Sequence, residues 1–194
     1  MLDTMIDAHI RCLQRLKPMA SALENAGAAM LQCLLGGGKL LICGNGGSAG
    51  DAQHFAAEIV GRFEKERRAY PAVALSTDTS ILTAVGNDYG YEEVFARQVQ
   101  GLGRPGDVLI GISTSGGSEN VVRAVQCARG MSMPTVGLLG KDGGALKELV
   151  DRAIVVENDI TARIQEAHIF VLHYWAGIIE RGLIADAGSQ ESAS

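Results

Sequence analysis

The segment Lys39–Phe63 constrains the fold of this chain most, because it joins an apolar run to a glycine-rich loop and then to a helical pattern. Leu40–Cys43 is continuously apolar, which predicts a buried strand. The loop Gly44-Asn45-Gly46-Gly47-Ser48 follows it directly. The helical pattern is carried by three apolar residues, Phe55, Ile59 and Val60. A strand that leads through such a loop into a helix exposes backbone N–H groups at the positive end of the helix dipole, so the segment predicts a site that binds a phosphate or a sugar.

The same arrangement recurs at Val108–Ile112, an apolar run that leads into the hydroxyl-rich loop Ser113–Ser118 and a helical segment. Three further apolar runs alternate with helical segments, at 71–75, 134–139 and 153–156. Continuous apolar strands are typical of parallel sheets that are covered on both faces. We therefore expect an α/β fold with a doubly wound five-stranded parallel sheet. Its ligands would bind beyond the carboxyl ends of the strands, where both loops lie.

Two helical patterns precede the first strand, over residues 3–34, with a break at Lys17-Pro18. Their apolar stripes must be buried against the sheet domain or against another subunit, and of these we expect contact with another subunit. The length predicts one domain over residues 1–186 that includes these helices as an N-terminal extension. Gly86–Gly90 predicts a turn, and the small polar residues 187–194 predict a disordered tail after a final helix at 160–183.

Composition narrows the class of protein. A net charge of −5 argues against nucleic-acid binding. The four cysteines are scattered without CxxC spacing, which predicts reduced thiols in a cytoplasmic protein. The start of the chain does not resemble a signal peptide, and no apolar run approaches the roughly 20 residues that span a membrane.

Two nucleotide-binding motifs are excluded by context. Residues 44–49 formally match G-x-G-x-x-A, but the second strand that should end in an acidic residue about 20 positions later is missing. No Gly-Lys-Ser/Thr follows the loop, so it is not a Walker A loop. Hydroxyls and backbone N–H groups without a lysine, as in Ser113–Ser118, suit a monophosphate.

Histidine and carboxylate side chains are the candidates for metal binding or proton transfer. His54 and Glu58 are four residues apart and share one helix face. On the final helix, Gln165 and His173 lie about 80° apart around the axis and roughly 12 Å along it, so they can converge only on a point between them. Imidazoles with a carboxylate can bind a divalent metal of the zinc type. A histidine and a carboxylate beside a sugar can equally move protons between adjacent carbons, and spacing leaves both open.

Four separated motifs resemble the sugar isomerase (SIS) domain family and, within it, the phosphoheptose isomerases. They are CGNGGSAGDAQHFAAE, ALSTDTSILTAVGNDYGY, GDVLIGISTSGGSENV and ARIQEAHIFVLH, in the family's order over roughly residues 5 to 185. The resemblance implies flavodoxin-like subunits in a cytoplasmic homotetramer with active sites near subunit contacts. It also implies an aldose–ketose isomerase that converts sedoheptulose 7-phosphate to D-glycero-D-manno-heptose 7-phosphate, the first step toward ADP- or GDP-heptose precursors.

The resemblance assigns roles residue by residue. One zinc ion per subunit would be held by His54, Glu58, Gln165 and His173. Glu58 and His173 would be the proton-transfer pair, and His168 a supporting residue. Substrate contacts are implied for the other matching positions and two of the metal ligands: Asn45, Gly46, Gly47, Glu58, Asn87, Asp88, Ser113, Thr114, Ser115, Ser118 and Gln165. Ala162 stands where some members have an acidic residue, so this chain lacks that acid.

Two other readings of the resemblance are weaker. A non-enzymatic branch of the family, a replication regulator that binds the bacterial initiator protein, has similar loops but lacks the carboxylate and the second histidine that are Glu58 and His173 here. Sugar-phosphate sensors attached to transcription regulators carry a DNA-binding domain, for which this chain has no room. We therefore expect an enzyme that binds a small sugar phosphate, and neither nucleic acid nor membrane.

Overall fold

The sheet at the centre of the molecule has five parallel strands in the order β2-β1-β3-β4-β5. The structure is a computed structural model that describes residues 1–191. Gly44 of β1 is in register with Ile112 of β3, so the two strands end at the same edge. The strands are β1 Leu40–Gly44, β2 Ala72–Ala74, β3 Val108–Ser113, β4 Thr135–Gly140 and β5 Arg152–Val156.

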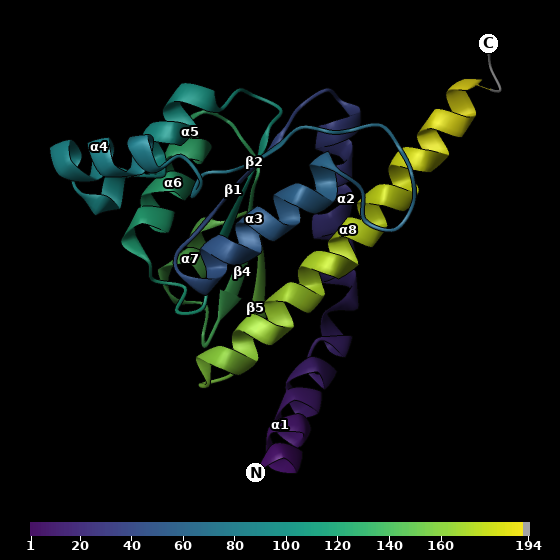
Figure 1. Cartoon of the computed structure of the whole chain (residues 1–194), viewed down its shortest axis with the longest axis vertical. Helices are drawn as coiled ribbons and strands as arrows, with labels where there is room; N and C mark the ends of the chain where they lie inside the picture. Colours follow the sequence, from purple (N-terminus) through teal and green to yellow (C-terminus); the bar gives the residue numbers. More distant parts are fainter. Residues whose placement is uncertain (192–194) are drawn as a thin grey trace.

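Helices cover both faces of this sheet (Figure 1). Side chains alternate along β1, because successive residues of a strand point to opposite faces: Leu40 and Ile42 join one core, and Leu41 and Cys43 the other. The first core is covered by α1 Leu2–Gln14, α2 Ala20–Leu35, α3 Gly47–Val60 and α8 Thr161–Glu191, with the 3₁₀ turn Lys17–Met19 between α1 and α2. The second core is covered mainly by α5 Ala96–Leu102, α6 Glu119–Gly130 and α7 Gly144–Leu149.

The strand order confirms the expected doubly wound α/β fold. The chain first moves from β1 to β2 and then returns past β1 to β3, so the winding reverses between β1 and β3. At such a reversal the loops after the two strands separate to opposite faces and leave a crevice, which is where ligands bind in open α/β sheets. Both of the small-residue loops singled out in the sequence follow these two strands.

Two sequence-based expectations are wrong. Gly86–Gly90 is not a turn as a whole, because α4 runs from Thr79 to Tyr89 and only Gly90, with a φ of 96°, ends it. The Asp78 side chain caps the first turn of α4 by accepting from Ile81 N at 2.9 Å, and the helix then continues through the polar residues. A 3₁₀ turn, Tyr91–Glu93, follows it.

The expected tail is also partly helical. α8 continues through residues 187–191, which were expected to be disordered, and residues 192–194 lie outside the described part of the chain.

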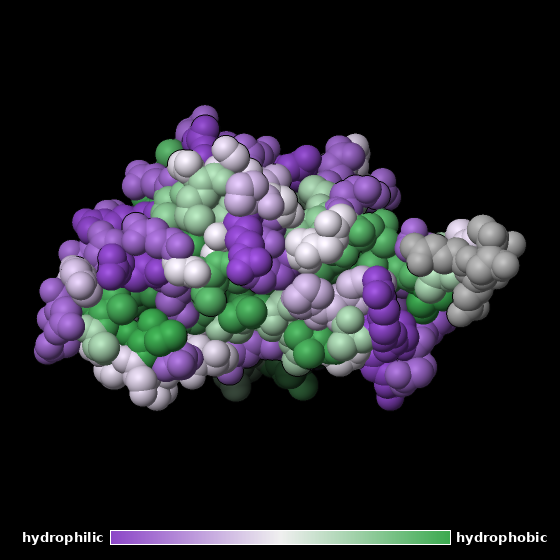
Figure 2. All heavy atoms as spheres, turned by 90° about the horizontal axis from the view of Figure 1, so that it is seen from above, coloured by the Kyte–Doolittle hydropathy of each residue, from purple (hydrophilic) through white to green (hydrophobic). Residues whose placement is uncertain are grey.

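None of the helices in the described residues is long and apolar enough to cross a membrane. Seen from above in Figure 2, apolar and polar side chains are interspersed over the surface. None of the four cysteines forms a disulfide.

Candidate active site

The two loops after β1 and β3 come together at the predicted edge of the sheet. Asn45, in the first loop, and Asn120, in the first turn of α6, exchange two side-chain hydrogen bonds of 2.8 Å each. The Tyr91 hydroxyl also donates to Asn45 Oδ1, at 3.2 Å. Because Asn120 is buried and both its amide oxygen and its amide nitrogen are hydrogen-bonded to Asn45, the two loops are held in one relative position.

The hydroxyl loop, residues 113–118, gathers its oxygen atoms at the start of α6. Ser113 Oγ lies 2.9 Å from Ser118 Oγ and 3.4 Å from Ser115 Oγ. Gly116 has a φ of 65°, and a Cβ at that position would overlap the carbonyl of Gly143. The glycine therefore allows the hydroxyl loop to pack against the next loop of the same edge. Clustered hydroxyls at a helix N-terminus form a site that favours an anion such as phosphate.

The histidine cluster, which comprises His54, Glu58 and His173, lies on the neighbouring helices α3 and α8. His54 Nε2 is 3.2 Å from Glu58 Oε1 and 2.8 Å from His173 Nε2. The His54 side chain is 43% exposed and that of Glu58 19%, so both are open to a ligand. The His173 ring is covered on one side by Phe63, whose centroid lies 5.7 Å away with an interplanar angle of 26°.

The donor atoms of the histidine cluster fit a divalent metal. The three ligand atoms all lie within 4.8 Å of one another, and ligands of a tetrahedral zinc at 2.0–2.1 Å are about 3.3 Å apart. Two imidazole nitrogens that point at each other without an ion between them can share only one proton, whereas a metal would satisfy both lone pairs. Two imidazoles and a carboxylate are ligands that zinc accepts.

Gln165, the fourth ligand implied by the family resemblance, lies eight residues before His173 on α8, about two helical turns away. Its amide lies directly against Gly47, where a Cβ would overlap it. α3 and α8 lie side by side (Figure 1) and run in the same direction, since Gln165 contacts Gly47 while His173 contacts His54 farther along both helices. Gln165 therefore faces the glycine-rich loop.

His168, the residue expected to support the site, contacts the sheet. It is fully buried, and its Nε2 donates to the Leu139 carbonyl at 3.1 Å. Burial lowers the pKa of His168 to about 4, although the hydrogen bond to Leu139 acts in the opposite direction. The imidazole is therefore neutral at physiological pH and joins α8 to the end of β4.

Asn87 and Asp88 are not brought into the histidine cluster. Both are exposed in the last turn of α4, and Asn87 Nδ2 donates to Asp88 Oδ1 at 2.8 Å. α4 projects from the sheet on the side away from α8 (Figure 1). Their expected contact with sugar hydroxyls stays a prediction.

Sequence reasoning missed three residues that shape the site. Asn120 fixes the first loop, Phe63 covers His173, and Asp51 lies one turn before His54 on α3. Burial raises the pKa of Asp51 to about 6, against the opposing effect of His54. Asn120 had a usable signal, because it is an amide in the first turn of a helix that follows a hydroxyl-rich loop. Asp51 and His54 are three residues apart on one helix, which the sequence also shows. Phe63 had no such signal, because its partner His173 lies on α8, far along the chain.

Comparison with known proteins identifies the family of the chain. The family model described as SIS domain matches residues 6–140. A phosphoheptose isomerase of Nitratiruptor sp. is 64% identical over 142 residues, which are 73% of this chain and 76% of the relative. One from Helicobacter hepaticus is 49% identical over 180 residues, 93% of this chain and 92% of the relative.

A solved structure extends the agreement to three dimensions. Phosphoheptose isomerase GmhA from Neisseria gonorrhoeae superposes with a TM-score of 0.88 at 46% identity, over 93% of this chain and 97% of that chain. A phosphoheptose isomerase from Francisella tularensis gives a TM-score of 0.85 at 42% identity. The chain therefore belongs to the phosphoheptose isomerases of the SIS domain family.

Proposed function

We propose that this chain is an aldose–ketose isomerase that converts sedoheptulose 7-phosphate to D-glycero-D-manno-heptose 7-phosphate, the first step toward activated heptose precursors. One observation carries the proposal: Glu58 and His173 both reach His54, at 3.2 and 2.8 Å, and form one open acid–base cluster. The relatives that match most of the chain are named phosphoheptose isomerases. A regulator of replication would need neither the carboxylate nor the second histidine.

The reaction follows from the two parts of the site. The phosphate binds at Ser113, Thr114, Ser115 and Ser118, and this remote binding energy holds the reacting end of the sugar in place. Asn45, Gly46, Gly47 and Gln165 contact the sugar chain, as do Asn87 and Asp88. One of Glu58 and His173 removes the proton from the carbon beside the carbonyl. The other moves a proton on the oxygen, which gives an enediol that is reprotonated at the neighbouring carbon.

The proposal includes one zinc ion per subunit, held by His54, Glu58, Gln165 and His173. The spacing of the two imidazoles and the carboxylate supports it. Bound zinc would stabilise the negative charge that develops on the carbonyl oxygen. The protein's own groups then hold and move the protons.

We further propose that residues 1–186 form one domain that assembles as a cytoplasmic homotetramer. The apolar side chains of Leu2, Met5, Ile6 and Ile10 on α1 are between 45% and 69% exposed. An apolar helix face of this kind is suited to a contact between subunits.

A coupled turnover assay with sedoheptulose 7-phosphate tests the proposal, with and without a chelator and with zinc added back. We expect turnover that the chelator abolishes and zinc restores. Turnover that the chelator does not reduce would support the isomerase activity and contradict the requirement for zinc. No turnover from a folded oligomer would overturn the isomerase and favour binding to the replication initiator.

A further inference from the structure

We infer that Phe63 is a positioning residue for His173, and that the buried carboxylate of Glu180 holds Phe63 in place. The inference rests on the proposed isomerase function, since it explains how one member of the proton-transfer pair is kept in its orientation. It is carried by contacts between α8 and loop 61–68, the segment that follows α3.

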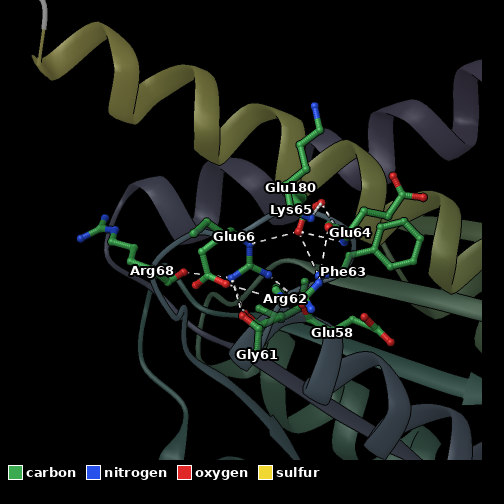
Figure 3. Close-up of polar contacts among 11 residues, drawn as sticks. Glu58, Gly61, Arg62, Phe63, Glu64, Lys65, Glu66, Arg68 and Glu180 are labelled. Atoms are coloured by element: carbon green, nitrogen blue, oxygen red, sulfur yellow. Dashed lines mark hydrogen bonds and ion pairs between the residues drawn. The ribbon is translucent and has the colours of Figure 1, made fainter.

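Glu180 binds this loop through its backbone. Glu180 is 3% exposed, and its two oxygens accept from three successive N–H groups: Phe63 N at 2.9 Å, Glu64 N at 3.0 and 3.3 Å, and Lys65 N at 3.0 Å. Figure 3 shows the carboxylate pointing at this stretch of backbone. Burial acts to raise the pKa of Glu180, but the backbone hydrogen bonds and the charge of Arg67 outweigh it, so the pKa lies below its ordinary value. The carboxylate is therefore ionised and stays bound to the loop at neutral pH.

Arg67 connects the same loop to the helix that carries Glu58. Its guanidinium donates to the carbonyl of Glu58 at 2.7 Å and to that of Ile59 at 2.9 Å. These are carbonyls of the last turn of α3, which lack partners within the helix and favour a positive charge. Arg67 Nε lies 3.8 Å from Glu180 Oε1, and both side chains are 4% exposed. One buried ion pair thus joins the end of α3 to α8.

The loop, once fixed, places the Phe63 ring against the His173 ring, with 5.7 Å between centroids. His173 and Glu180 are seven residues apart on α8, so they lie on the same face of the helix. The ring torsion of a histidine has a broad energy profile, so its plane is set by what packs against it. Of the described residues, Phe63 and His54 are the two whose rings contact His173. His54 belongs to the site itself, which leaves Phe63 as the support.

Four variants separate positioning from stability. Phe63→Leu removes the stacked ring and keeps an apolar side chain, whereas Phe63→Tyr keeps the ring. Glu180→Gln removes the charge that holds the loop. Glu64→Gln makes the same chemical change on an exposed side chain of the same loop and serves as the matched control.

Two readouts are needed. The first is kcat and KM for sedoheptulose 7-phosphate. We expect Phe63→Leu to lower kcat about tenfold with KM within about twofold of wild type, because misorientation of a catalytic group affects the chemical step. Phe63→Tyr should restore kcat, Glu180→Gln should resemble Phe63→Leu, and Glu64→Gln should resemble wild type.

The second readout is the ring resonance of His173 in protein labelled with [13C]histidine, assigned with a His173→Gln sample. Phe63→Leu and Glu180→Gln should both shift it, because the neighbouring aromatic ring is lost or displaced, and Phe63→Tyr should keep it near the wild-type position. Wild-type kcat in Phe63→Leu, or an unmoved resonance in Glu180→Gln, would overturn the inference. A wild-type protein without turnover whose resonance still responds to both variants would refute the isomerase and leave the positioning of His173 supported.

Discussion

The hydroxyl loop and the histidine cluster differ in how far apart in the sequence their residues lie. The hydroxyl loop takes all its oxygens from residues 113–118, and Ser113 and Ser118, at its two ends, are only 2.9 Å apart. In the histidine cluster, His54 and His173 are 119 positions apart in sequence. A local turn fixes the first, whereas the packing of α3 on α8 fixes the second. Variants in the two regions should therefore fail in different ways.

The largest expected effect is on the histidine cluster. Glu58→Gln should lower kcat by about 10²- to 10⁴-fold, the range for loss of a general acid or base. The melting temperature should stay close to wild type, because Arg67 contacts the Glu58 carbonyl and not its side chain. The measurement is steady-state turnover beside thermal unfolding. A folded Glu58→Gln enzyme with near-normal turnover would show that this carboxylate is not part of the proton-transfer pair.

The second-largest effect is expected for a substitution that the backbone of the hydroxyl loop cannot accommodate. Gly116→Ala should lower the free energy of unfolding by more than about 2 kcal/mol, since a left-handed φ of 65° and the Gly143 carbonyl both oppose a side chain. Gly117→Ala is the matched control, because its Cβ would meet nothing within 4 Å. Denaturant unfolding at fixed protein concentration compares the two, and equal stability would mean that the loop relaxes freely.

His168 tests the contact between α8, which carries His173, and strand β4. The pKa of His168 is about 4 in the folded chain, and its ordinary value is 6.5. Between these two pH values, the unfolded chain therefore binds a proton at His168 that the folded chain does not bind. Stability is therefore complete above about pH 6.5 and should fall by up to about 2 kcal/mol between pH 7 and pH 5. Unfolding curves at both pH values measure it. His168→Gln should lose this part of the pH dependence, and an unchanged slope would assign the effect to other groups.

The smallest effect separates binding from chemistry. Ser118→Ala should raise KM for the sugar phosphate about tenfold and leave kcat within about twofold, the pattern of a lost hydrogen bond to a charged group that is bound equally throughout the reaction. Glu58→Gln should show the reverse. If Ser118→Ala lowered kcat alone, the division of labour between the two regions would be wrong.

The loops were easier to predict than the cluster for a physical reason. The conformation of a glycine-rich loop between an apolar run and a helical pattern is determined by residues that are neighbours in the sequence. Both loops lie at the predicted positions, directly after β1 and β3. The pair His54 and Glu58 was equally accessible, because helical periodicity places residues four apart on one face. Their contact, at 3.2 Å, follows from the helix alone.

Local signals were misleading where a helix could override them. Gly86, Asn87 and Asp88 favour turns individually, yet α4 continues through them because its N-cap and the positive φ of Gly90 set its ends. α8 likewise extends to Glu191, past the point where the apolar pattern ends.

The sequence by itself determined the parallel α/β sheet, the two loops at its edge and the His54–Glu58 pair, because these depend on residues that are close along the chain. Only the tertiary structure decided that His173 reaches His54, that Phe63 covers His173 and that Glu180 binds the backbone after α3. These contacts join residues more than a hundred positions apart, and their distances depend on how two helices pack on one face of the sheet. Local periodicity fixes which face a side chain occupies, but it does not fix which distant side chain shares that face.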